Sequence, residues 1–192
     1  MSLDEKQKKF IDYLLSLAKE GAENRGALAE LRSGLGRIPG EMAHVHKHVA
    51  PYLPEKSYND HWYYLIATLF GLYPKQKPGY PRRVNRNGKA WTEHWSLGAA
   101  FRPLKQKSDS MGTRFVALLN AHPDDLDDHL RHAVSLLKSN DQPLDWFRLF
   151  EDLLQWDHPD GHVQLWWARD FYRSDSGKAY VPDSDLTTKE ED

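Results

Sequence analysis

The amino-acid sequence predicts an all-α protein of two packed helical bundles, with about eight or nine helices and a long basic loop between them. Three observations lead to this prediction. Apolar residues recur three or four positions apart along most of the 192 residues, which is the spacing of helices that bury one face. No segment alternates apolar and polar residues for long enough to predict a strand. Pro, Gly and Asp separate the apolar runs, as expected for short turns between helices.

The first part of the chain predicts four helices. A possible capping box, Ser2 with Glu5, starts the first helix, and Gly21 is expected to end it. From about Ser57 the run HWYYLIATLFGLY is apolar on nearly every side, so it is expected to be the central buried helix, ended by Pro74. Between these two lie shorter helices over residues 28–35 and 42–49.

Helical spacing returns after residue 95 and predicts the second bundle. The expected helices cover residues 97–104, 115–119, 123–137, 146–154 and 163–171. Pro and Asp residues are expected to start the last three: Pro123, then Asp141 with Pro143, then Pro159 with Asp160. In the last helix the apolar face is marked by Val163, Trp166, Trp167 and Phe171, and we expect Trp166 to be a buried anchor whose replacement by Ala unfolds the bundle.

This pattern divides the chain into two helical units and a tail. Residues 1–95 are predicted to form an N-terminal helical subdomain, and residues 96–180 a C-terminal helical bundle. The N-terminal part includes the basic loop 74–95, which has three prolines, two glycines and no apolar period. Residues 181–192 form an acidic tail that is expected to be disordered.

Composition excludes several classes of protein. The chain has no Cys, which excludes disulfides, thiolate metal sites and a Cys nucleophile. Its longest apolar stretch is only a few residues, too short for a membrane span. The start, MSLDEKQKKF, is charged and lacks the apolar core of a secretory signal. We therefore expect a cytoplasmic protein with no membrane partner.

The charges are distributed unevenly along the chain. The sequence has 26 Lys and Arg against 28 Asp and Glu, for a net charge of −2. Residues 1–119 hold 19 basic and 11 acidic residues, for +8, whereas residues 120–192 hold 7 and 17, for −10. Clustered basic residues are typical of a surface that binds phosphates. The alternative is a pair of solvated faces of opposite sign that attract each other.

The densest basic stretch covers residues 81–107. Its cations are Arg82, Arg83, Arg86, Lys89, Arg102, Lys105 and Lys107. Trp91 and Trp95 are interleaved with them. Cations neutralise phosphates and aromatic faces stack on bases, so the combination favours nucleic-acid binding. The two Trp residues are four positions apart, so they also fit the alternative role of core anchors.

The sequence lacks the common catalytic signatures. The chain has no phosphate-binding glycine loop, no nucleophile elbow and no HExxH motif. Three clusters contain metal-ligand residue types: His44, His46 and His48; Asp127, Asp128, His129 and His132; and Asp157, His158, Asp160 and His162. We interpret them as surface and cap residues rather than metal ligands. Helical phosphohydrolases of the His-Asp class need an adjacent His-Asp pair, and this sequence has none. No catalytic residue, metal or cofactor is predicted.

Several motifs, in their order and spacing, resemble the CasB family, the small subunit of the type I-E CRISPR Cascade complex. The resemblance runs from about Leu14 to Tyr172. Its segments are LAELRSGLGR, WYYLIATLFGLYP, SLGAAFRPL, TRFVALLNAHPDDLDDHLRHAVSLLKS, LDWFRLFEDLLQW and VQLWWARDFY. It implies an all-helical, non-catalytic subunit that acts in antiviral defence and occurs in more than one copy per complex. It also implies partners: other Cascade subunits, the guide crRNA, target DNA and the displaced strand.

The resemblance also implies which residues contact nucleic acid. By matching motif they are Arg32, Arg37, Arg102, Arg114 and Arg131. Arg25, one or two turns before the first of these motifs, and Lys105 and Lys107, beside the Arg102 motif, are added to them. The loop residues Arg82, Arg83 and Arg86 are added on charge alone. For Arg114 and Arg131 the alternative is a salt bridge to Asp124 or Asp128.

Two other functions remain open at this point. One is a helical adaptor that binds an acidic protein, which salt-dependent binding of nucleic acid would distinguish. The other is a helical metal-dependent phosphohydrolase built on the Asp and His clusters, which metal analysis would distinguish.

Overall fold

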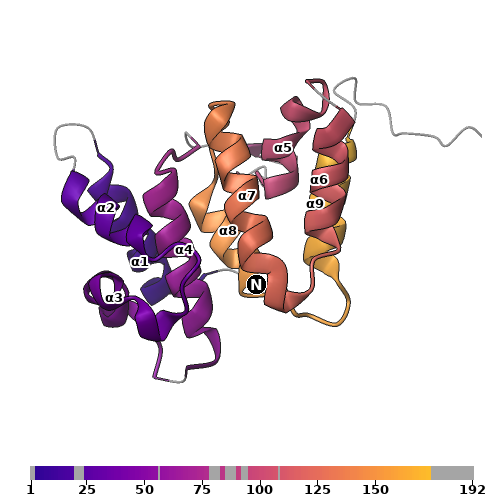
Figure 1. Ribbon diagram of the computed structural model, residues 1–192. Helices are drawn as coiled ribbons and strands as arrows, with labels where there is room; N and C mark the ends of the chain where they lie inside the picture. The colour runs from indigo at the N-terminus through magenta and orange to yellow at the C-terminus, as the bar shows by residue number, and fades with distance from the viewer. Residues whose placement is uncertain are drawn as a thin grey trace, which may run out of the picture.

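The computed structural model describes residues 3–19, 24–55, 57–77, 83–84, 90–91, 95–107 and 109–173. Within them it has α-helices at α1 (Glu5–Leu17), α2 (Arg25–Ser33), α3 (Ala43–Val49), α4 (Asp60–Leu72), α5 (Leu97–Lys105), α6 (Asp109–Leu119), α7 (Leu126–Ser139), α8 (Trp146–Leu153) and α9 (His162–Tyr172). The prediction of an all-α fold is confirmed (Figure 1). No helix among the described residues is long and apolar enough to cross a membrane.

The N-terminal helices surround α4, which is the buried helix that the sequence predicted. Ten consecutive residues of α4, from Trp62 to Gly71, are buried. The start of α1 differs from the prediction. Asp4 is its N-cap, and the capping box pairs Asp4 with Gln7 rather than Ser2 with Glu5. An Asp carboxylate suits this position, because it accepts the backbone N–H of Gln7 at 2.8 Å.

The predicted starts of the C-terminal helices were each a few residues early. Pro123 begins a 3₁₀ turn, and α7 itself begins at Leu126. The N-cap of α8 is Asp145, whose side chain accepts the backbone N–H of Arg148, so Asp141 does not start this helix. Asp141 instead has a positive φ of 55° and forms an ion pair with Lys75. The start of α9 likewise moves past Pro159 and Asp160, because Gly161 at φ 56° is the N-cap.

One buried cluster joins helices from both ends of the chain. Phe10 of α1, Tyr63 of α4 and Phe150 of α8 meet with ring centroids 4.8–5.6 Å apart. Aromatic pairs at such distances bury large surfaces and hold helices in register. The core is continuous among the described residues, and the division into units at residue 95 stays a prediction.

The predicted loop 74–95 is fastened at both ends to the connection between α7 and α8. Lys77 and Lys75 exchange backbone hydrogen bonds with Leu144. At the other end the indole of Trp95 donates to the carbonyl oxygen of Pro143 at 3.2 Å, and the Lys77 ammonium lies 4.3 Å from the Trp95 ring centroid.

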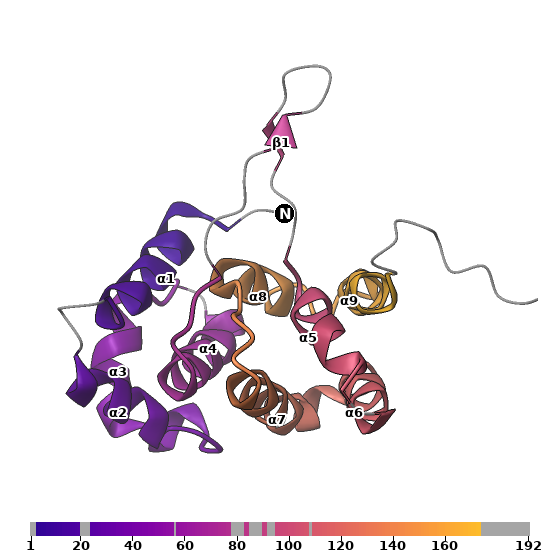
Figure 2. The same ribbon diagram turned by 90° about the horizontal axis from the view of Figure 1, so that it is seen from above.

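Within the loop, the short strands β1 (Arg83–Val84) and β2 (Ala90–Trp91) pair antiparallel, with Arg83 opposite Trp91. They stand clear of the helices (Figure 2). Arg82 and Arg86 lie outside the described residues, as does the predicted acidic tail 181–192.

The apolar face of α9 is centred on Trp167, not on Trp166. Val163, Trp167 and Phe171 are buried, whereas 37% of the Trp166 surface is exposed. The indole N–H of Trp167 donates to Asp152 Oδ2 at 2.6 Å. The expectation that Trp166 is the buried anchor was wrong, because adjacent Trp residues fit the helical spacing almost equally well.

The Asp152 carboxylate is fully buried between α8 and α9. Burial raises its pKa to about 6, although the Arg148 guanidinium, 2.8 Å away, and the Trp167 indole act in the opposite direction. A pKa above the ordinary value means that the folded protein binds this proton more tightly than the unfolded chain does. The stabilisation from this proton is therefore complete below about pH 4 and lost as the pH rises through about 6.

Asp152→Asn tests this pH dependence, because the amide keeps an oxygen acceptor for the indole but cannot ionise. We expect the free energy of unfolding of the wild type, relative to that of Asp152→Asn, to fall by up to about 3 kcal/mol between pH 4 and pH 7. Urea unfolding of both proteins at these pH values measures it. The other carboxyl groups titrate in both proteins, so their contributions cancel in the difference between the two free energies of unfolding. A difference that stays constant with pH would show that burial does not control this carboxyl.

Candidate nucleic-acid interface

Cations from several elements lie beside helix α7 or at its ends. Arg131 and Lys138 lie on α7 seven residues apart, two turns along one side of the helix. Arg37 follows α2, Lys107 follows α5, and Arg114 belongs to α6. We call these five residues the α7 band: Arg37, Lys107, Arg114, Arg131 and Lys138. Four of them were predicted from the sequence.

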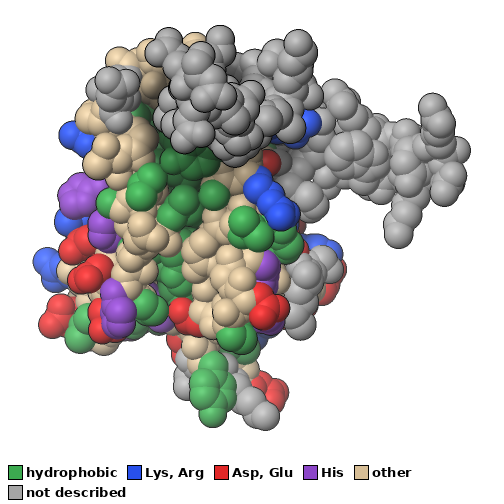
Figure 3. Space-filling model, turned by 90° about the vertical axis from the view of Figure 1, so that its right-hand side faces the viewer, with side chains coloured by type: hydrophobic (Ala, Val, Ile, Leu, Met, Phe, Trp, Pro, Cys, Tyr) green, Lys and Arg blue, Asp and Glu red, His purple; other side chains and the backbone are tan. Residues whose placement is uncertain are grey.

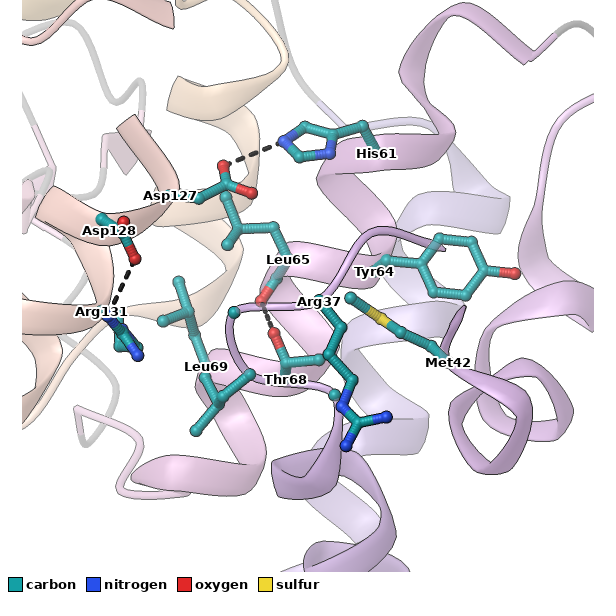
Figure 4. Close-up of a pocket in the computed structure, with 13 residues that line it drawn as sticks. Arg37, Met42, His61, Tyr64, Leu65, Thr68, Leu69, Asp127, Asp128 and Arg131 are labelled. Atoms are coloured by element: carbon teal, nitrogen blue, oxygen red, sulfur yellow. Dashed lines mark hydrogen bonds and ion pairs between the residues drawn. The ribbon is translucent and has the colours of Figure 1, made fainter. Parts of the chain in front are cut away.

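One end of the band is the junction of α7 with α4 and the turn after α2. Gly36, at φ 74°, reverses the chain after α2 and brings it beside Arg131. Arg37 and Arg131 line the same small pocket (Figure 4). Across this pocket His61 Nε2 lies 2.9 Å from Asp127 Oδ1, and this hydrogen bond raises the pKa of the imidazole. The contact ties α4 to α7 beside the two arginines.

Arg131 is paired, as the alternative for this residue supposed. Its guanidinium lies 2.9 Å from Asp128 Oδ1, one turn earlier on α7. Both side chains are substantially exposed, so the pair adds little to stability and is open to exchange with a phosphate. Arg114 differs, because it is exposed and has no hydrogen bond or ion pair with any other described residue.

The other end of the band lies where α7 stops. The Lys107 ammonium donates to the side-chain oxygen of Asn140, the C-cap of α7, at 3.0 Å. Lys138 is exposed in the last turn of the same helix. Lys138 was not predicted as a site residue, although its spacing of seven residues from Arg131 places both on one side of a helix and could have indicated it. The contact of Lys107 with the end of α7 depends on how α5 packs against its neighbours, and local sequence patterns carry no information about that packing.

The remaining predicted residues lie away from this band. Arg25 and Arg32 are exposed on α2, and the Arg32 Nε donates to the carbonyl oxygen of Gly71 at 3.0 Å, which ties α2 to α4. On α5, Arg102 is half-buried, and the Lys105 ammonium lies 4.9 Å from the Tyr172 ring centroid. The side chain of Arg83 lies outside the described residues. The predicted set therefore does not form one continuous patch among the described residues.

The face over α6 and α9 has a different character. Figure 3 shows apolar side chains along its middle, with charged side chains of both signs around them. Its exposed apolar residues are Val116, Leu165, Trp166 and Tyr172. This face lacks the one-sign charge of a phosphate-binding surface, which distinguishes it from the α7 band.

The His cluster of α3 is divided among separate contacts. His44 is exposed, whereas His46 Nδ1 lies 2.8 Å from the Tyr64 hydroxyl. His48 is buried, with Nε2 2.8 Å from Glu30 Oε2. Hydrogen bonds to a lysine and to His48 hold the pKa of Glu30 below its usual range. These side chains join α3 to α2 and α4.

The second cluster is also divided, because Asp127 bonds His61 and Asp128 bonds Arg131. In the third, His158 Nδ1 lies 3.6 Å from Asp160 Oδ2 and its ring 4.7 Å from that of His162, whose Nε2 lies 3.3 Å from Gln155 Oε1. Within the described residues, no group of three His, Asp or Glu side chains is arranged to hold a metal ion.

A family model described as CRISPR-associated protein Cse2 matches residues 27–172. This chain belongs to the Cse2 family. A Cse2 protein from Thermus thermophilus is 33% identical over 167 residues, which cover 85% of this chain and 88% of that protein. The resemblance drawn from the sequence motifs is thus confirmed.

Solved structures of Cse2 and CasB proteins share the fold. The crystal structure of a Cse2-family protein from T. thermophilus has a TM-score of 0.70 at 31% identity and covers 90% of this chain and 99% of its own. CasB from M. ruber has a TM-score of 0.64 at 28% identity and covers 88% and 93%. A chain of a CRISPR RNA-guided surveillance complex, at 24% identity, has a TM-score of 0.67 and covers 87% and 91%. These likenesses agree with the Cse2 assignment.

The packing of α5 against α9 explains the glycine of the Leu-Gly pair that begins α5. A Cβ on Gly98 would lie 1.9 Å from the carbonyl oxygen of Trp167, so α5 and α9 are in backbone contact at this point. Only glycine permits such an approach.

Proposed function

We propose that this chain is a non-catalytic, nucleic-acid-binding subunit of a Cascade-type CRISPR surveillance complex in the cytoplasm. There it supports the assembly of guide crRNA and target DNA and holds the displaced strand, beside other subunits and a second copy of itself. Membership of the Cse2 family and the fold shared with a surveillance-complex chain support this proposal. The observation that carries it is the α7 band: Arg37 and Arg131 line one pocket at α7, Lys107 bonds the C-cap of α7, and Arg114 faces α7 across a second pocket.

The chemistry of the band suits phosphates rather than bases. Guanidinium groups offer paired N–H donors that match phosphate oxygens, and ammonium groups act as point charges. Such contacts are the same for every sequence. Base pairing between guide and target then supplies sequence specificity, and this chain supplies support for the backbone.

The isolated chain should bind nucleic acid weakly and without sequence preference, with dissociation constants of roughly micromolar or weaker. Arg37→Ala with Arg114→Ala should weaken this binding and lower the log–log salt slope by about 1.4 on a single strand and about 1.8 on a duplex, because each phosphate contact contributes roughly 0.7 or 0.9. Fluorescence anisotropy across a salt series, on several unrelated sequences, measures the effect.

Lys8→Ala with Lys9→Ala is the matched control, since it removes two exposed cations from α1, away from the band. We expect it to leave the salt slope nearly unchanged. We prefer Arg37 and Arg114 to Arg32 for this test, because the Arg32 side chain also bonds α4. Failure of both single-stranded and duplex DNA to bind at low salt would reject the proposal and favour a protein-binding adaptor. Loss of binding for one sequence only would show base readout instead.

A further inference from the structure

A groove runs between α6 and α7 beside the α7 band. The two helices lie side by side (Figures 1 and 2), and Phe101 of α5 also lines the groove. Its volume is about 430 Å³, which is within the range of pockets that hold small organic ligands. A phosphate group alone is much smaller than this space.

The floor of the groove is apolar. Phe101 of α5, Leu118 of α6 and Ala133 of α7 are almost fully buried beneath it, and half-buried Leu136 adds to the floor. A flat, weakly polar ring would remove this surface from water, and burial of apolar surface is favourable. The floor therefore fits a ring better than it fits an ion.

The rim of the groove is basic and polar. Arg114 lies on the α6 side, and His129 and His132 lie on the α7 side. No Asp or Glu is among the described residues that line it, although residues 120–192 carry a net charge of −10. Arg114 is therefore the one formally charged side chain among the described residues that line the groove, and its positive charge favours an anionic ligand.

Two serines on α7 complete the rim as acceptors. The Ser135 hydroxyl donates to the carbonyl oxygen of Arg131 at 2.8 Å, and the Ser139 hydroxyl donates to that of Ser135 at 2.9 Å. Because each hydroxyl hydrogen is already donated to a backbone carbonyl oxygen, the two hydroxyl oxygens can accept hydrogen bonds from N–H groups of a ligand. Nucleobases carry such donors on their edges.

We propose that this groove holds one nucleotide of a single strand. Its phosphate lies against Arg114 and the imidazoles of His129 and His132, and its base lies on the floor formed with Leu118 and Leu136. The inference rests on the proposed function, because the strand that reaches the groove is held by the α7 band. A duplex keeps its bases stacked and paired, so only a single strand can place a base here without the cost of unpairing it.

Ala117→Phe tests the groove directly. Ala117 is exposed and lines the groove one turn from Arg114, so a ring at this position occupies the space and leaves the cations in place. We expect the affinity for oligothymidylate to fall roughly tenfold, the scale of one lost base contact. The salt slope and the affinity for duplex DNA should stay unchanged, because no phosphate contact is removed.

Val116→Phe is the matched control. Val116 is the neighbouring exposed residue of α6 and does not line the groove. The same new ring there should leave single-strand binding as in the wild type, and thermal melts of both variants establish that each is folded.

A second measurement uses the wild-type protein alone. Oligothymidylate should bind more tightly than an abasic strand of equal length, and Ala117→Phe should abolish this difference. Thymidine monophosphate should compete only weakly if the groove takes a nucleotide within a strand. If the ligand is instead a free nucleotide, the monophosphate should compete as well as the strand does, compared per binding site. Equal binding of the abasic strand and oligothymidylate by the wild type would overturn the inference. If the protein in that case still binds the nucleic-acid backbone, and Arg37→Ala with Arg114→Ala still lowers the salt slope, the proposed function remains intact.

Discussion

Trp167→Ala is expected to cost about 3–5 kcal/mol of the free energy of unfolding. The indole is fully buried and packs against Trp156, with ring centroids 5.1 Å apart. Its removal leaves a large cavity between α8 and α9. It also leaves the buried Asp152 carboxylate without its 2.6 Å hydrogen bond, and an unsatisfied buried polar group is costly. Urea unfolding followed by circular dichroism measures the loss.

Trp166→Ala is the control for this prediction, since it removes the same side chain one residue earlier. Trp166 is 37% exposed, and its main described contacts are His162 and the Arg148 guanidinium, 5.2 Å from the ring centroid. We expect a loss of about 1 kcal/mol, the scale of an exposed cation–π contact. Equal losses for the two variants would contradict the burial pattern of α9. If Arg37→Ala with Arg114→Ala lowers stability as much as Trp167→Ala does, those arginines are structural and the interface is misplaced.

Gly98→Ala is expected to destabilise the fold by about 3 kcal/mol, at the upper end of the usual cost of overpacking. The added Cβ would lie 1.9 Å from the Trp167 carbonyl oxygen and 2.7 Å from its carbonyl carbon. Both are backbone atoms, so no side-chain rotation relieves the clash. Helices α5 and α9 must move apart, which loosens the packing around Phe101, Phe115 and Phe171.

Gly112→Ala provides the comparison, because Gly112 lies in α6 and an added Cβ would meet no described atom within 4 Å beyond its chain neighbours and the adjacent backbone of its own helix. Alanine is the better helix former, so this change should stabilise the protein by roughly 0.5–1 kcal/mol. Both substitutions replace Gly by Ala within a helix, so the change in helix propensity is the same for each. The difference between their melting temperatures therefore measures the effect of the close contact between α5 and α9. Similar effects of the two changes would mean that α5 and α9 do not meet at Gly98.

The residue types of the candidate interface could be predicted from the sequence, but their arrangement could not. Arg37, Arg114 and Arg131 were predicted, yet they are far apart in the chain. Only the packing of the α2 turn and α6 against α7 brings them to one helix. The groove between α6 and α7 was not predicted at all, because His129 and His132 were considered only as metal ligands or surface charges.

The sequence by itself determined the all-α class, most of the helices and the buried character of α4, because these follow from apolar spacing and from residues that start and stop helices. It could not distinguish Trp166 from Trp167, since a helix advances only about 100° per residue and both positions border the same apolar face. The tertiary structure decided which of the two is buried, how closely α5 approaches α9 and which cations share a surface. Each of these depends on contacts between segments remote in the chain, and local spacing carries no information about such contacts.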